Sequence, residues 1–127
     1  MVRSLTALAC VAALAVASGC GESDQEQARE VVQDYVQARA DQDSERVCEL
    51  FSESFKQELA VEDCAGFVQE QSSGADGSEE LEVVDVRVNG DKATANIDVT
   101  RGSEGGPTRI GLLLEREDDE WRITGFQ

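Results

Sequence analysis

The spacing of hydrophobic residues follows a helical period in the middle of the chain and a two-residue period in its last third. Five residues recur at the spacing i, i+3, i+4, i+7 and i+8: Ala28, Val31, Val32, Tyr35 and Val36. This spacing predicts an amphipathic helix with one buried face. Ser23 and Glu26 have the spacing of a capping box, which marks the expected start of this helix.

Two further helices are expected before the segment 72–78, whose Gly and Ser residues predict a loop. Asp43 can cap the second helix. The apolar pattern of this helix continues in a shorter piece, and its expected buried residues are Val47, Leu50, Phe51, Phe55 and Leu59. The third helix is indicated by Cys64, Phe67 and Val68 and is expected to end before Ser72.

From Leu81 onward, apolar and polar residues alternate, as in a strand with one buried face. The alternation changes phase between Val83 and Val84, which predicts a β-bulge, and Asn89-Gly90 predicts a hairpin turn. The three strands that follow have the apolar positions Ala93, Ala95, Ile97 and Val99, then Ile110, Leu112 and Leu114, then Trp121 and Ile123. The predicted fold class is α+β, with three N-terminal helices packed on a bent, four-stranded antiparallel sheet.

The first 19 residues have the layout of a secretory signal peptide. Arg3 precedes an uncharged apolar run, residues 5–17, which is shorter than the ~20 residues of a membrane-spanning helix. The residues that follow, Ala17-Ser18-Gly19-Cys20, resemble the lipobox of bacterial lipoproteins, in which signal peptidase II cleaves before a lipid-modified cysteine. The alternative is an ordinary secretory signal cleaved near Ala17, which would leave Cys20 as a spare thiol.

The lipobox resemblance implies a division of the chain and a location. Residues 1–19 would be the lipoprotein signal peptide, residues 20–24 a lipidated tether that begins at Cys20, and residues 25–127 a single domain. A diacyl modification supplies two chains, which anchor a protein stably in a membrane. The expected location is the extracytoplasmic face of the cell membrane, where the lipid anchor makes the membrane a partner.

The charge of the chain argues against one class of partner. Without residues 1–19, ten basic and 27 acidic residues remain, so the formal net charge is −17. Nucleic-acid binding requires a basic surface, and nucleic acid is therefore not expected as a partner. The same charge disfavours adsorption of the domain itself on an anionic membrane.

Two of the four cysteines remain for a role inside the domain. Cys10 lies in the signal peptide and Cys20 in the lipobox, which leaves Cys48 and Cys64. An even pair in an oxidising compartment predicts a disulfide. A metal site has little support, because the chain contains no His and no Cys-x-x-Cys.

The predicted disulfide requires a break in the second helix. If residues 43–59 formed one straight helix, Cys48 would lie roughly 16 Å from its end at 1.5 Å per residue. Cys64 could not then reach it, since bridged Cα atoms lie within about 7 Å. We therefore predict a break near residues 52–54, where Ser54 and Gln57 have capping-box spacing.

The order of elements resembles the nuclear transport factor 2-like superfamily, a cystatin-like α+β cone. The last strand, with Glu120-Trp121-Arg122-Ile123, fits this resemblance. More narrowly, the chain resembles small uncharacterised lipoproteins of high-GC Gram-positive bacteria, through its lipobox and the residues Val31, Val32, Tyr35, Cys48, Leu50, Phe51 and Cys64. The superfamily includes isomerases, dehydratases and cyclases as well as non-catalytic binding and dimerising modules, and fold alone does not choose among them.

The resemblance implies a cone, and seven residues are candidates for its pocket: Tyr35, Val32, Phe51, Val86, Ile97, Leu112 and Trp121. Tyr35 is the polar group expected on an inward helix face, and no inward carboxylate is predicted to pair with it. We therefore assign no catalytic residue, no metal ligand and no cofactor.

We expect a lipid-anchored, non-catalytic module that binds a small apolar ligand or an envelope protein. One alternative is an isomerase- or dehydratase-type enzyme that uses Tyr35 in an apolar pocket. Another is a structural envelope protein that forms a homodimer through the exposed face of its sheet.

Overall fold

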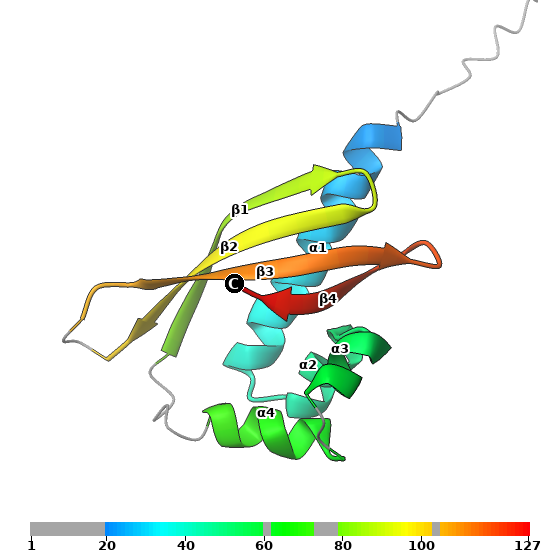
Figure 1. Cartoon of the computed structure of the whole chain (residues 1–127). Coiled ribbons are helices and arrows are strands. Elements are labelled where there is room, and N and C mark those ends of the chain that lie inside the picture. Colours follow the sequence, from blue (N-terminus) through cyan, green and yellow to red (C-terminus); the bar gives the residue numbers. More distant parts are fainter. Residues whose placement is uncertain (1–19, 60–61, 73–78, 103–104) are drawn as a thin grey trace, which may run out of the picture.

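The computed structural model describes residues 20–59, 62–72, 79–102 and 105–127, with side chains from Asp24 onward. The predicted signal peptide and most of the loop 72–78 lie outside the described residues. The elements are α1 (Cys20–Ala40), α2 (Ser44–Leu50), α3 (Glu53–Glu58), α4 (Cys64–Ser72), β1 (Glu79–Asn89), β2 (Lys92–Arg101), β3 (Thr108–Glu117) and β4 (Glu120–Phe126) (Figure 1).

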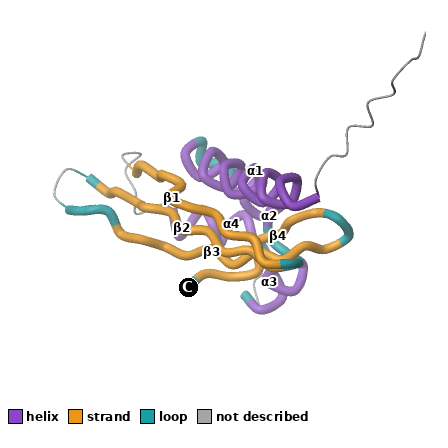
Figure 2. Tube along the Cα trace, turned by 90° about the horizontal axis from the view of Figure 1, so that it is seen from above, coloured by secondary structure: helices purple, strands orange, loops and turns teal. Residues whose placement is uncertain are grey.

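The four strands form one antiparallel sheet in the order β1-β2-β3-β4. The long helix α1 lies along one face of this sheet (Figure 2). The shorter helices α2, α3 and α4 lie near the C-terminal end of α1 (Figure 1). The predicted α+β class and the four-stranded sheet are confirmed. The expected second helix is two helices, α2 and α3, so the described residues contain four helices rather than three.

The predicted break lies between α2 and α3, where the chain pairs with the sheet. Phe51 forms a parallel β-bridge with Ile123, and the backbone N–H of Ser52 donates to the carbonyl of Ile123 at 2.9 Å. Ser52 then caps α3, since its Oγ accepts a hydrogen bond from the backbone N–H of Phe55 at 3.1 Å. The expected cap, Ser54, lies two residues too late, because the pairing with β4 ends at Ser52.

The predicted disulfide is present between Cys48 of α2 and Cys64 of α4, whose Cα atoms are 6.0 Å apart. It closes a loop with a sequence separation of 16 residues that contains the whole of α3. The bridge therefore fixes α4, which has few strand neighbours of its own, against α2.

The helix α1 begins earlier than its capping box predicts. Residues 20–24, for which we expected a tether, belong to α1. Asp24 forms an ion pair of 2.8 Å with Arg116 of β3, and Gln25 Nε2 donates to the carbonyl of Val86 at 2.6 Å. These contacts with the sheet hold the start of the helix in place, and the periodicity of the sequence does not reveal them.

Two irregularities of the sheet follow the sequence signals, whereas the register shift between Leu113 and Leu114, where β3 pairs with β4, was not predicted. The β1–β2 register shifts between Val83 and Asp85, which confirms the predicted bulge. At this bulge, β1 changes which of its alternate residues point into the core, so that Val84 is 40% exposed and Val86 is buried. Gly90 has φ +65° in the first hairpin turn, a conformation that glycine adopts without strain.

Candidate functional site

A cleft of about 410 Å³ lies at the end of the molecule where α1, α2 and α4 meet the sheet. This volume is within the range of small-molecule pockets. Its walls consist of Tyr35, Arg39, Val47, Phe51, Leu59, Phe67, Val68, Gln71, Arg101, Ile110 and Phe126. The disulfide between Cys48 and Cys64 positions the α4 wall, because it joins α4 to α2.

The structure brings only part of the predicted pocket to this cleft. Tyr35 and Phe51 line it. The other five candidates are core residues away from its walls, at most 5% exposed: Val32, Val86, Ile97, Leu112 and Trp121. They face inward as expected, but they belong to the hydrophobic core that forms where α1 packs against the sheet.

An aromatic cluster forms the floor and rim of the cleft. Phe126, at the end of β4, is 43% exposed. Its ring centroid lies 6.2 Å from that of Tyr35, 6.0 Å from that of Phe51 and 5.6 Å from that of Phe55. Such spacings suit edge-to-face and tilted contacts. Phe126 is thus a large hydrophobic side chain that is exposed on the wall of the cleft.

A cluster of polar side chains from α1, β1 and β2 also lies at the cleft. Arg39 of α1 donates from Nη1 to the Tyr35 hydroxyl at 2.9 Å and pairs through Nη2 with Glu79 of β1 at 3.2 Å. Arg101 of β2 lies 3.7 Å from the same carboxylate. The side chains of Arg39 and Glu79 are 15% and 10% exposed, whereas that of Arg101 is 65% exposed.

The protonation of Tyr35 follows from this setting. Burial raises the pKa of its phenol, and the neighbouring Arg39 guanidinium lowers it by a smaller amount. The phenol is therefore neutral near pH 7. Its oxygen accepts a hydrogen bond from Arg39, so its own O–H remains a donor.

Sequence reasoning missed Arg39, Glu79 and Arg101, and the expectation of no inward carboxylate was wrong. Glu79 lies two residues before Leu81, and Arg101 two residues after Val99, so strand alternation places both on the inner face. The two are also register partners across β1 and β2. Continuing the alternation to the ends of the strands would have found them.

The cleft offers binding groups rather than an acid–base pair. Its described wall residues include two arginines and no carboxylate, and the chain has no His. Glu79 pairs with Arg39 and is not a wall residue. Within the described residues, no group of three or more potential metal ligands lies together.

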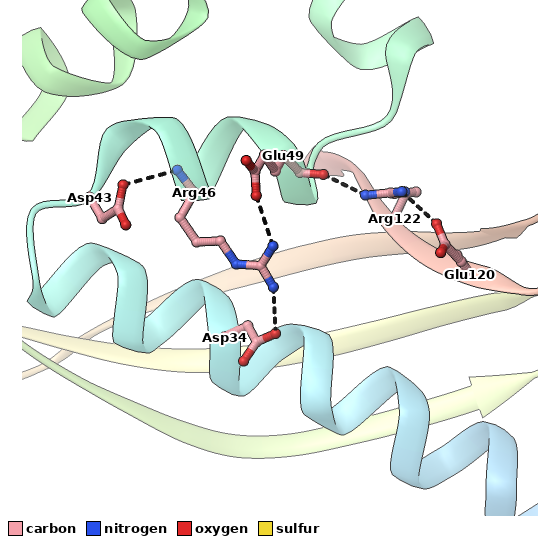
Figure 3. Close-up of polar contacts among 6 residues, drawn as sticks. All are labelled: Asp34, Asp43, Arg46, Glu49, Glu120 and Arg122. Atoms are coloured by element: carbon pink, nitrogen blue, oxygen red, sulfur yellow. Dashed lines mark hydrogen bonds and ion pairs between the residues drawn. The ribbon is translucent and has the colours of Figure 1, made fainter.

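A second hollow, of about 460 Å³, lies beside α2 and the β3–β4 turn and is polar. Arg46 pairs with Asp34 at 3.0 Å and with Glu49 at 2.9 Å, while Arg122 pairs with Glu120 and donates to the Glu49 carbonyl (Figure 3). These charges satisfy one another, and exposed pairs contribute only about 0–1 kcal/mol each. We assign this network to the attachment of α2 to α1 and β4.

Cys20, the predicted lipidation site, is the first residue of α1. None of the described helices is both long enough and apolar enough to cross a membrane.

Comparison with known proteins places the fold. No protein-family model and no curated protein matches the sequence. A solved nuclear transport factor 2-like protein of unknown function from Shewanella baltica has a TM-score of 0.62 at 14% identity, covering 83% of this chain and 91% of that one.

Two further solved structures have the same arrangement. A protein of unknown function with a cystatin-like fold from Nostoc punctiforme has a TM-score of 0.61 at 14% identity, covering 83% of this chain and 89% of that one. A nuclear transport factor 2-like protein of unknown function from Cytophaga hutchinsonii has a TM-score of 0.51 at 14% identity, with coverages of 78% and 85%. The protein therefore has the nuclear transport factor 2-like fold.

Proposed function

We propose that this protein is a lipid-anchored, non-catalytic module at the extracytoplasmic face of the cell membrane, and that its cleft binds a small apolar ligand. The observation that carries the proposal is the cleft of about 410 Å³, with apolar side chains from three helices and two strands around it. Pockets of this size and composition, with a few polar groups, are the usual sites of small ligands.

The burial of the wall supports a ligand more than a protein partner. Of the residues that line the cleft, only Phe126 is a large hydrophobic side chain that is substantially exposed to solvent. A docked protein usually covers about 800 Å² per partner, and a single exposed phenylalanine on a hollow is little area for that purpose. A small molecule can enter the hollow and cover Phe126 together with Phe67 and Ile110.

The position of the cleft fits an anchor at Cys20. Tyr35 lies 15 residues after Cys20 on the same helix. At 1.5 Å per residue, this separation is about 22 Å along the helix axis. An anchored domain would thus present the cleft at the end of α1 remote from the lipid, where a ligand in the aqueous envelope can reach it.

Native mass spectrometry of the processed, lipid-anchored protein, extracted from the membranes of a bacterium that processes lipoproteins, tests the ligand. We expect a bound species of discrete small mass. Ile110→Trp would fill the cleft and abolish that species, whereas Val84→Trp, at the bulge and away from the cleft wall, is the matched control. A ligand-free mass for the unmodified protein would contradict the proposal and favour an envelope protein as partner, which crosslinking would identify.

The anchor is tested separately by substitution of cysteines. Cys20→Ala should move the protein from the membrane fraction to the soluble fraction and remove the diacylglycerol mass. Cys10→Ala, in the predicted signal peptide, is the control and should change neither. Membrane association that survives Cys20→Ala would refute lipidation at this residue.

A further inference from the structure

We propose that the ligand of this cleft is an anionic amphiphile, whose head group contacts Arg101 and whose apolar tail lies against the aromatic cluster. This inference rests on the proposed function and adds the chemical class of the ligand. It is carried by the charge of the cleft, which is opposite to the charge of the chain as a whole.

The charged side chains are distributed unevenly. The chain has 27 acidic and 11 basic residues, yet the described residues that line the cleft include two arginines and no acidic residue. Glu79, behind the wall, pairs with both arginines. Within the part of the chain that the structure describes, two guanidinium groups against one carboxylate leave one positive charge in excess at this end of the cleft.

The two arginines have different roles in this arrangement. Arg39 is nearly buried, and its two terminal guanidinium nitrogens, Nη1 and Nη2, are paired with Tyr35 and Glu79. Arg101 is 65% exposed and approaches Glu79 only to 3.7 Å, so most of its donors are accessible to solvent and to a bound ligand. A guanidinium binds carboxylate and phosphate oxygens in pairs. Arg101 therefore supplies the direct contact, and the Tyr35 hydroxyl can donate a further hydrogen bond.

The negative charge elsewhere on the chain does not prevent this binding. At physiological ionic strength, charges further apart than about 8 Å are largely screened. The excess charge of Arg39 and Arg101 acts at contact distance within a partly desolvated cleft, where attraction is strongest. The apolar end of the ligand would lie near Phe67 and Phe126, on the remaining walls of the cleft.

Four amphiphiles with tails of nearly equal length and different head groups test the inference: decanoate, decyl phosphate, decanol and decyltrimethylammonium. Calorimetric titration of the processed protein, freed of non-covalently bound lipid, measures each affinity. We expect one of the two anions to bind about tenfold tighter than decanol, since a charge-assisted contact is worth about 1.4 kcal/mol or more. The better anion identifies the head group as a carboxylate or a phosphate.

Arg101→Met is the decisive variant, because the exposed side chain can be replaced with little effect on folding. This substitution should lower the affinity for the better anion at least about fivefold and change the affinity for decanol less than about twofold. Arg109→Met is the matched control, since Arg109 pairs with Asp98 outside the cleft. Its anion affinity should equal that of the unmodified chain.

The outcomes separate the two proposals. Equal affinity for decanol and both anions, or the tightest binding by decyltrimethylammonium, would overturn the anionic ligand and leave an apolar ligand in place. An anion affinity that Arg101→Met leaves unchanged would also overturn it. If none of the four probes binds, both the anionic ligand and the proposed binding function are wrong.

Discussion

Removal of the disulfide between Cys48 and Cys64 should lower the stability of the domain by about 3 kcal/mol. The bridge closes a loop with a sequence separation of 16. In the chain-entropy model, a loop of this size reduces the entropy of the unfolded chain by about 10 cal/mol/K, which is about 3 kcal/mol at 25 °C. For a total stability of about 5–15 kcal/mol, this loss is a large fraction.

Urea unfolding of the oxidised protein and of the Cys48→Ala, Cys64→Ala double variant measures this loss. Trp121 is the only tryptophan and is buried, so its fluorescence reports unfolding. With an m-value of about 1.5 kcal/mol/M, the midpoint should fall by roughly 2 M. The unmodified protein with its disulfide reduced is the control, and its midpoint should match that of the double variant.

The same variant tests the link between the disulfide and the cleft. The bridge holds α4 against α2, and α4 supplies Phe67 and Val68 to the cleft. Under conditions where both proteins are folded, ligand affinity should fall when the bridge is absent. A loss of stability under about 1 kcal/mol would refute the constraint that we assign to the bridge. An unchanged affinity would show that α4 is positioned without it.

Three further predictions concern single residues. Ser52→Ala should cost about 1 kcal/mol of unfolding free energy, because it removes the cap of α3; Ser54→Ala, at the cap expected from the sequence, should cost less in the same denaturation assay. Glu79→Gln should cost about 1–2 kcal/mol, because it leaves the mostly buried Arg39 guanidinium without its carboxylate. Its exposed neighbour supplies the control, Glu80→Gln, and equal effects of the two would refute the role of Glu79. Burial raises the pKa of the Tyr35 phenol above the ordinary 10.0. The contribution of the buried phenol to stability is therefore present below about pH 10 and is lost as the pH rises above that value. Absorbance titration of this single tyrosine should show a midpoint above 10 in the folded protein, and a midpoint at 10 would contradict its burial.

The secondary structure of this chain could largely be predicted from local signals. The i, i+3, i+4 spacing around Val32 identified α1, and the change of phase at Val83 identified the bulge. Both signals depend on neighbours in the sequence, because side-chain direction repeats every 3.6 residues in a helix and every two in a strand. The disulfide added one distance limit, which correctly required a break between Cys48 and Cys64.

The composition of the cleft could not be predicted in the same way. The pattern placed Ile97 and Leu112 on the inner face, but the distance between α1 and the sheet decided that they are core rather than cleft wall. That distance depends on how side chains from separate elements fill the space between them.

The sequence by itself thus determined the type and order of the elements, most of the residues that face inward, and the bulge and first hairpin turn of the sheet, because those properties follow from local periodicity and turn chemistry. The tertiary structure decided which of the inward residues meet an open space and which charges share it. Arg39, Glu79 and Arg101 lie on three elements and come together only when α1 packs across the ends of β1 and β2. Contacts of this kind between distant segments leave no periodic signal in the chain.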